Sequence, residues 1–246
     1  MSTGRKLCAF LRIPLITSCC VAFCTTMFLI DFHQLFGWKH TAKHLCLSSH
    51  EILRSGQVYR IFTYTFVHKG PWHLAVTMIP MLFVGSLVEK QVGSILFFLF
   101  LIICWVISTT LEVAMATMLY HVFHSLFHGC NMGFSGIAFG LTAVLSQAVK
   151  HKQCGLCIFQ VPVFLLPWIF FILYFVCFHH GAVFLHLGGI VAGYAYKSDV
   201  FNCCLPSPEK LAEWEYSNHF KCLVQLPCFS AQITPSIHAK TVVRRV

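Results

Sequence analysis

Six apolar stretches, almost free of charged residues, follow one another along the chain. A helix needs about 20 mostly apolar residues to cross a bilayer, and most of these stretches approach that length. The pattern therefore predicts an all-α integral membrane protein with a bundle of six transmembrane helices. The second and sixth stretches are short, which is typical of helices buried against neighbours rather than lipid. The six cover residues 7–30, 72–88, 93–117, 132–149, 157–178 and 182–196.

The first stretch follows Arg5 and Lys6, like the start of a signal peptide. It is longer than the apolar part of such a peptide and has no clear cleavage site with small residues, so we expect it to remain as a helix. No Arg- and Ser-rich mitochondrial leader precedes it, which favours the endoplasmic reticulum or another secretory-pathway membrane as the location.

The composition supports the membrane interpretation. Of the 246 residues, 57% are hydrophobic and 10% are charged, and the mean hydropathy is +0.75, whereas soluble domains carry about 25% charged residues. The net charge of +9 comes from bases spread over loops and tail. Such a distribution indicates contact with anionic lipid at the bilayer surface, and no nucleic-acid partner is expected.

The distribution of Lys and Arg predicts the orientation. Lys90 lies between the second and third stretches, Lys150 and Lys152 lie between the fourth and fifth, and further bases follow from Lys197. The connections after the third and fifth stretches carry no Lys or Arg. Because basic loops remain in the cytosol, both termini are expected to be cytosolic.

The long first connection does not follow this rule. It has about 40 residues, beyond the usual length of a connection, and it must lie outside although it carries five bases. Its apolar positions make it amphipathic, so we expect a partly structured segment in the outer interface with its bases at the lipid headgroups. An inverted topology is the alternative. The bases are Lys39, Lys43, Arg54, Arg60 and Lys69.

Three regions are expected: residues 1–54 with the first helix, a core over 55–197, and a cytosolic tail over 198–246. The tail is weakly patterned, with one or two helical turns over 209–216, and partial disorder is expected there. It is also the place where partners in degradation or trafficking are expected to bind. Cys203 and Cys204 directly follow the last apolar stretch and are candidates for palmitoylation.

The other cysteines indicate no metal site. Cys154 and Cys157 have a zinc-like spacing, but no second pair lies nearby. We therefore expect no metal and no cofactor. Five cysteines fall in apolar stretches and are interpreted as small hydrophobic residues: Cys19, Cys20, Cys24, Cys104 and Cys177.

Ser135 opens the fourth apolar stretch between Gly133 and Gly136. A helix N-terminus has free N–H groups and a positive dipole end, which favour developing negative charge. The arrangement suits a nucleophile whose attack creates an oxyanion. Taken alone, the same residues also fit a Gly/Ser face for helix packing.

His186 strengthens the catalytic hypothesis, because ionisable residues within a membrane helix are rare and functional by default. A neutral imidazole can accept the proton of a serine. Gly189 and Gly193 on the same helix allow a close approach of two backbones. If the fourth helix packs on this face through its own glycines, Ser135 and His186 come within hydrogen-bond reach.

These residues resemble the rhomboid intramembrane serine proteases. The serine motif is Gly133-Phe134-Ser135-Gly136, and the histidine motif begins at His186 and continues to Gly189 and Gly193. Residues 56–68, 72–74 and 85–94 match further family motifs in the same order, so that the resemblance covers most of 55–197.

The resemblance implies a Ser–His dyad that cleaves transmembrane proteins within or near the bilayer. Ser135 would attack the scissile carbonyl, and His186 would act first as base and then as acid. Phe139 lies at the position where the family's aromatic ring packs on the imidazole. Substrates would be membrane proteins whose transmembrane helices are unstable, since a stable helix hides its carbonyls.

One motif departs from the family. The pattern His-x-x-x-Asn, which supplies oxyanion donors on the second helix, reads here from His73 to Thr77. A threonine hydroxyl can donate, but from a shorter arm. Loss of one such donor costs about 2.7–4 kcal/mol of transition-state stabilisation. His73 and the serine backbone N–H remain, so reduced activity is expected. The family's Trp-Arg pair is Tyr59-Arg60, a milder change.

Two carboxylates lie in or beside the apolar stretches. Glu89, at the inner end of the second, is interpreted as a structural cap or ion-pair partner, and Glu112 as a residue near the outer end of the third. A catalytically weak or inactive rhomboid-like protein that routes transmembrane clients to degradation or trafficking is the competing hypothesis. The presence of both Ser135 and His186 favours the protease, whereas Thr77 favours the alternative. A channel or transporter lacks support, because the chain shows no inverted repeat.

Overall fold

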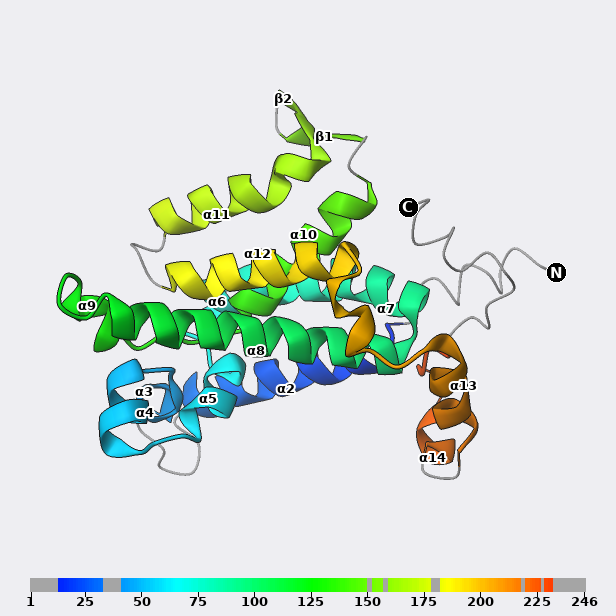
Figure 1. Cartoon of the computed structure of the whole chain (residues 1–246), viewed down its shortest axis with the longest axis horizontal. Helices are drawn as coiled ribbons and strands as arrows, with labels where there is room; N and C mark the ends of the chain where they lie inside the picture. The colour runs from blue at the N-terminus through cyan, green and yellow to red at the C-terminus, as the bar shows by residue number, and fades with distance from the viewer. Residues whose placement is uncertain are drawn as a thin grey trace.

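The computed structural model describes residues 13–32, 41–149, 152–156, 159–177, 182–217, 220–226 and 228–231. This part of the chain is mainly helical, with one small β-hairpin. Helix α8 (Ser94–Met118) runs through the middle of the molecule, with α2 (Leu15–Phe32) along one side of it and α12 (Val183–Lys197) along the other (Figure 1).

Three helices in the described residues are long and apolar enough to cross a membrane. They are α2, α8, and the continuous segment formed by α6 (Pro71–Pro80), η3 (Met81–Gly85) and α7 (Ser86–Val92). Helices α10 (Ser135–Ala148), α11 (Leu166–Cys177) and α12 are apolar but shorter. Pro80 lacks a backbone N–H, and the helix continues after it through one wider π-type turn.

The first connection folds into short helices: α3 (Thr41–Leu45), α4 (Ser49–Ser55), α5 (Arg60–Thr63) and η2 (Tyr64–Phe66). They lie with α9 (His124–Phe127) at one end of α8 (Figure 1). Their apolar side chains, such as Leu47 and Ile52, form a cluster with Trp105 of α8. The Trp105 indole N–H donates to the Ile61 carbonyl at 3.0 Å, which fixes this layer to α8.

The predicted fifth helix begins too early. The chain forms an antiparallel hairpin of β1 (Gln153–Leu156) and β2 (Phe159–Pro162), then η4 (Val163–Leu165) and α11. Pro162 explains the later start, because proline disfavours helical geometry in the residue before it. Pro167 is tolerated in the first turn of α11, where a backbone N–H is free anyway. Cys157 lies outside the described residues.

Part of the tail packs on the bundle. After η5 (Val200–Cys203), α13 (Pro208–Tyr216) and α14 (Lys221–Val224), the carbonyl of Cys228 accepts the N–H of Leu15 at 2.8 Å. The carbonyl of Ser230 accepts the N–H of Ser94, also at 2.8 Å. The tail therefore holds the starts of α2 and α8 together. Pairing of this kind leaves no hydrophobic pattern in the sequence.

Glu89 has the structural role of a cap, but for helices other than its own. Its buried carboxylate accepts the N–H groups of Ile16 and Thr17 at 2.9 and 2.8 Å, and the hydroxyl of Ser94 at 2.6 Å. These donors belong to the first turns of α2 and α8, where N–H groups have no partner within the helix. Glu89 thus joins three helices at one end of the bundle.

Candidate active site

Ser135 and His186 meet in the interior of the bundle. Ser135 is the first residue of α10, and His186 lies in the first turns of α12. The Ser135 Oγ and the His186 Nε2 are 2.9 Å apart, and both residues are buried. This distance allows direct proton transfer between the hydroxyl and the imidazole.

Glycines bring the two helices this close. An added Cβ at Gly189 would lie 1.9 Å from the carbonyl oxygen of Gly136, and one at Gly193 would lie 2.4 Å from that of Gly140. Any larger residue would force the backbones apart, so the position of the imidazole depends on these glycines. Gly133 has another environment: it has a φ of 106°, and a Cβ there would lie 2.5 Å from His73 Cε1.

Two aromatic rings flank the imidazole. The Phe139 ring lies 4.7 Å from that of His186, in the place that the sequence indicates. Tyr174 of α11 lies still nearer, at 4.4 Å and edge-on, and it lines the same cavity as Ser135. Sequence reasoning did not identify Tyr174. It lies in an apolar stretch, where the sequence alone does not distinguish an aromatic residue of the site from one that faces lipid.

His73 packs against residues 130–134, the loop that directly precedes Ser135 and is called the serine loop below. Its Nδ1 accepts the N–H of Lys69 at 3.4 Å, which places the hydrogen of the neutral ring on Nε2. The ring packs against Gly133, two residues before Ser135. Its neighbour His68, with ring centroids 5.3 Å apart, accepts the N–H of Phe134 at 3.4 Å. Both imidazoles therefore contact the loop that presents Ser135.

The model of the rhomboid domain matches residues 55–202 of this chain. The geometry agrees with this match, because a serine begins one helix, an imidazole lies on a glycine-packed helix, and a second histidine lies beside the serine loop. The chain belongs to the rhomboid family.

Named relatives support the assignment. The chain is 27% identical to "Rhomboid-like protein 15" of Arabidopsis thaliana over 88% of its own length and 54% of the relative's. It is 24% identical to "Rhomboid-related protein 4" of Mus musculus over 75% of its length and 57% of the relative's. "Rhomboid-like protein 14, mitochondrial" of Arabidopsis thaliana shares 30% identity over 60% and 45%. The chain thus spans about half the length of the curated relatives it matches.

Thr77 is the departure from the rhomboid pattern, and its hydroxyl has partners of its own. It donates towards the carbonyls of His73 and Leu74, both at 3.0 Å. Such bonds to preceding carbonyls are usual for threonine inside a helix. The single hydroxyl hydrogen is thus held within α6 and does not point at Ser135.

A cavity of about 450 Å³ opens beside Ser135 between α6, α10 and α11. Its walls are almost entirely apolar, with Trp72 and Ile79 from α6, and Phe170 and Leu173 from α11. Thr77 and Phe139 also line it. In this rhomboid, the candidate nucleophile therefore faces an apolar space within the bundle.

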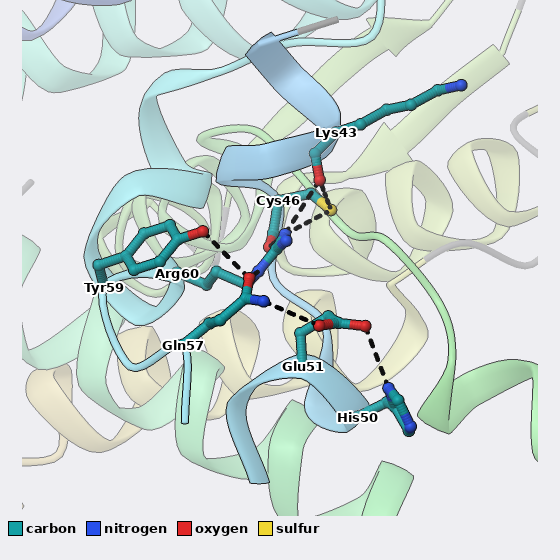
Figure 2. A network of polar contacts seen from close by, with 7 residues as sticks. All are labelled: Lys43, Cys46, His50, Glu51, Gln57, Tyr59 and Arg60. Atoms are coloured by element: carbon teal, nitrogen blue, oxygen red, sulfur yellow. Dashed lines mark hydrogen bonds and ion pairs between the residues drawn. The ribbon is translucent and has the colours of Figure 1, made fainter. Parts of the chain in front are cut away.

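A buried arginine organises the first connection. Arg60 donates to Gln57 Oε1 at 2.7 Å and to the carbonyl of Cys46 at 2.9 Å (Figure 2). Gln57 in turn donates to Glu51 at 3.0 Å. The pair Tyr59-Arg60 thus retains a buried guanidinium, and Tyr59 bonds Gln57 at 3.0 Å. Glu51 accepts from these neighbours, and its pKa is lowered chiefly by its hydrogen bond with His50.

A disulfide between Cys46 and Cys130 ties this connection to the serine loop. Directly after it, Leu47 and Asn131 exchange two backbone hydrogen bonds of 2.7 and 2.9 Å. Sequence reasoning missed this pair, although both cysteines lie outside the apolar stretches, in the two connections expected on the outer side. Among the residues that the structure describes, no group of three or more His, Cys, Asp or Glu is arranged to hold a metal ion.

Proposed function

We propose that this rhomboid is an intramembrane serine endopeptidase that uses Ser135 and His186 as a catalytic dyad. The observation that carries the proposal is the 2.9 Å contact between Ser135 Oγ and His186 Nε2 in a buried site. His186 Nε2 takes the serine proton while Oγ attacks the scissile carbonyl. The imidazolium then returns the proton to the leaving amine, and water releases the acyl group by the reverse route.

Three donors support the oxyanion of the tetrahedral intermediate. The backbone N–H of Ser135 lies at the start of α10, where the helix leaves it free. The second donor is the Nε2–H of His73, whose ring packs against the serine loop. The third is the hydroxyl of Tyr174, which lines the same cavity as Ser135 and takes the place of Thr77, whose hydroxyl bonds carbonyls of its own helix. Phe139 holds the imidazole ring in place.

The substrates are transmembrane proteins, recognised from within the bilayer. The cavity beside Ser135 lies between α6 and α11 and offers apolar walls, which suit the side chains of an unwound membrane segment. A stable helix keeps its carbonyls in internal hydrogen bonds, so segments that unwind easily are the preferred substrates.

The proposed topology has six membrane crossings with both termini in the cytosol, in the endoplasmic reticulum or another secretory-pathway membrane. Two of the long apolar segments separate Cys46 from Cys130, so two crossings return the chain to the same side. Disulfides form in oxidising compartments such as the lumen of the endoplasmic reticulum. The bond therefore supports placing the first connection and the serine loop on the lumenal side.

The test is labelling of the detergent-solubilised protein with a fluorophosphonate, which reacts with activated serines. Wild type should label, and Ser135→Ala and His186→Ala should not, while all three keep the same thermal unfolding midpoint. Cleavage of a reporter with a helix-breaking transmembrane segment should show the same dependence. Cleavage that persists in Ser135→Ala would contradict the mechanism.

The second candidate function is a catalytically weak or inactive rhomboid that binds transmembrane clients and routes them to degradation or trafficking. The commitment of the Thr77 hydroxyl to carbonyls of its own helix favours it. In this case the tail would bind the partners, and palmitoylation of the exposed Cys203 and Cys204 would hold it at the bilayer. A folded wild type that does not label but still captures membrane clients would establish this alternative.

A further inference from the structure

Glu112 of α8 is a buried carboxylate at the junction of the two elements that carry Ser135 and His186. Only 2% of its surface is exposed. Its Oε1 accepts the side-chain amide of Asn131 at 2.7 Å, and its Oε2 accepts the backbone N–H of Leu185 at 2.8 Å. One carboxylate therefore joins three segments that are far apart in the sequence.

The bond to Leu185 caps α12 from outside. Leu185 lies in the first turn of the helix, where N–H groups need a partner. The N-cap residue is Ala182, which has no polar side chain and forms no side-chain cap. Glu112 replaces that cap by accepting the N–H of Leu185. Because His186 directly follows Leu185, the cap sets the position of the imidazole.

The bond to Asn131 fixes the loop before the serine. Asn131 pairs with Leu47 through two backbone hydrogen bonds and follows the disulfide residue Cys130. Two residues later the N–H of Gly133 donates to the carbonyl of Tyr64 at 2.8 Å. The loop is thus held from one side by the first connection and from the other by Glu112.

We propose that Glu112 is a positioning residue that sets the distance between Ser135 and His186. Its two oxygens bind the serine loop and the first turn of α12. Both segments are therefore held against the rigid helix α8, and this fixes the distance between Ser135 and His186. The inference rests on the proposed protease function, because the spacing matters only if the dyad reacts.

Glu89 provides a matched control. It is also a buried carboxylate that accepts backbone N–H groups and a side chain at helix starts. Its partners belong to α2 and α8, which carry neither Ser135 nor His186. Loss of either carboxylate destabilises the protein, but only loss of Glu112 should slow the reaction of Ser135.

The experiment compares the rate of fluorophosphonate labelling with thermal unfolding in full-length protein. In Glu112→Met, the side chain keeps its length but accepts neither N–H donor, so both bonds are lost. A shift of about 1 Å in a catalytic group can cost about 10²-fold, and we expect the labelling rate to fall by about that factor. Glu89→Met should lower the unfolding midpoint and leave the labelling rate of the folded protein unchanged.

A double variant separates positioning from stability. In Glu112→Gln/Asn131→Asp, the glutamine amide donates to the new aspartate and its oxygen accepts from Leu185, so both bonds return. Labelling should recover towards the wild-type rate. Asn131→Asp alone sets two carboxylates against each other and should label slowly. Wild-type labelling in Glu112→Met, or a double variant as slow as Asn131→Asp alone, would overturn the proposal.

Hydrogen exchange makes the test independent of activity. Amides of 130–136 and 183–187 should exchange faster in Glu112→Met than in wild type, and the double variant, which keeps both bonds, should retain their protection. A folded wild type that fails to label would contradict the protease function, and the exchange data would then decide the bridge alone. Unchanged protection in Glu112→Met would remove the bridge as well.

Discussion

The substitution Gly189→Ala tests directly how the glycine-packed helices position the dyad. The added methyl would lie 1.9 Å from the carbonyl oxygen of Gly136. Ordinary contact begins at 3.4 Å, so α10 and α12 must separate by about 1.5 Å at this point. Gly189 lies one helical turn from His186, and Gly136 directly follows Ser135. Most of this displacement therefore reaches the dyad.

A separation of this size breaks the hydrogen bond between Ser135 Oγ and His186 Nε2. Their 2.9 Å distance would grow beyond the range in which a proton is shared. Because a misplacement of about 1 Å costs about 10²-fold, we expect the fluorophosphonate labelling rate to fall by about 10² or more. The overpacked interface should also lose about 1–3 kcal/mol of stability.

The same substitution elsewhere gives a graded series. Gly193→Ala meets the Gly140 carbonyl oxygen at 2.4 Å, one turn farther from His186, and should destabilise comparably but slow labelling less. Gly155→Ala in the exposed hairpin has its nearest neighbour at 3.9 Å and should change neither property. The reasoning is refuted if folded Gly189→Ala labels as fast as wild type, or if Gly193→Ala is the slower of the two.

Three further perturbations test separate parts of the site. Tyr174→Phe removes the hydroxyl proposed as the third oxyanion donor and should slow labelling by up to about 10²-fold. Adding Thr77→Asn should recover part of the rate, and no change in either variant would exclude Tyr174 as a donor. Replacing Cys46 and Cys130 by serine should cost about 2–5 kcal/mol of stability, measured as a lower unfolding midpoint in non-reducing buffer and no further loss on reduction. Burial lowers the pKa of His68 from its ordinary 6.5 to about 4. Between these two pH values the unfolded chain binds a proton that the folded protein does not. The free energy of unfolding should therefore decline as the pH falls from 6.5 to 4. In His68→Gln that decline should be smaller; an identical pH dependence of the midpoint would contradict this account.

The parts of the fold that follow helical periodicity could be predicted from the sequence. The glycines at 136, 140, 189 and 193 recur at the spacing of a close helix contact, and the structure has the two helices packed through them. The membrane class and the rhomboid family were equally accessible, because hydropathy and short motifs carry both. The early start predicted for the fifth helix was wrong because apolar composition does not separate a strand from a helix before a proline such as Pro162.

Contacts that join distant segments could not be predicted. The bridge from Glu112 to Asn131 and Leu185 depends on where three elements meet, and none of the three residues is unusual in its local sequence. Tyr174 is likewise one aromatic among many in an apolar helix. Thr77 illustrates a different limit. The sequence shows that a family donor has changed, but only the geometry shows that the new hydroxyl bonds carbonyls of its own helix.

The disulfide between Cys46 and Cys130 has a consequence for how the protein is made. The two cysteines are 84 positions apart in the sequence, and two apolar segments long enough to cross a membrane lie between them. In the proposed topology, the bond can close only after both have been inserted and the second cysteine has reached the compartment of the first. A chain with one segment misinserted would keep these two thiols on opposite sides of the bilayer. Oxidation of this pair therefore records correct insertion of the first half of the protein, and the fraction of oxidised chains in a cell measures the yield of its biogenesis.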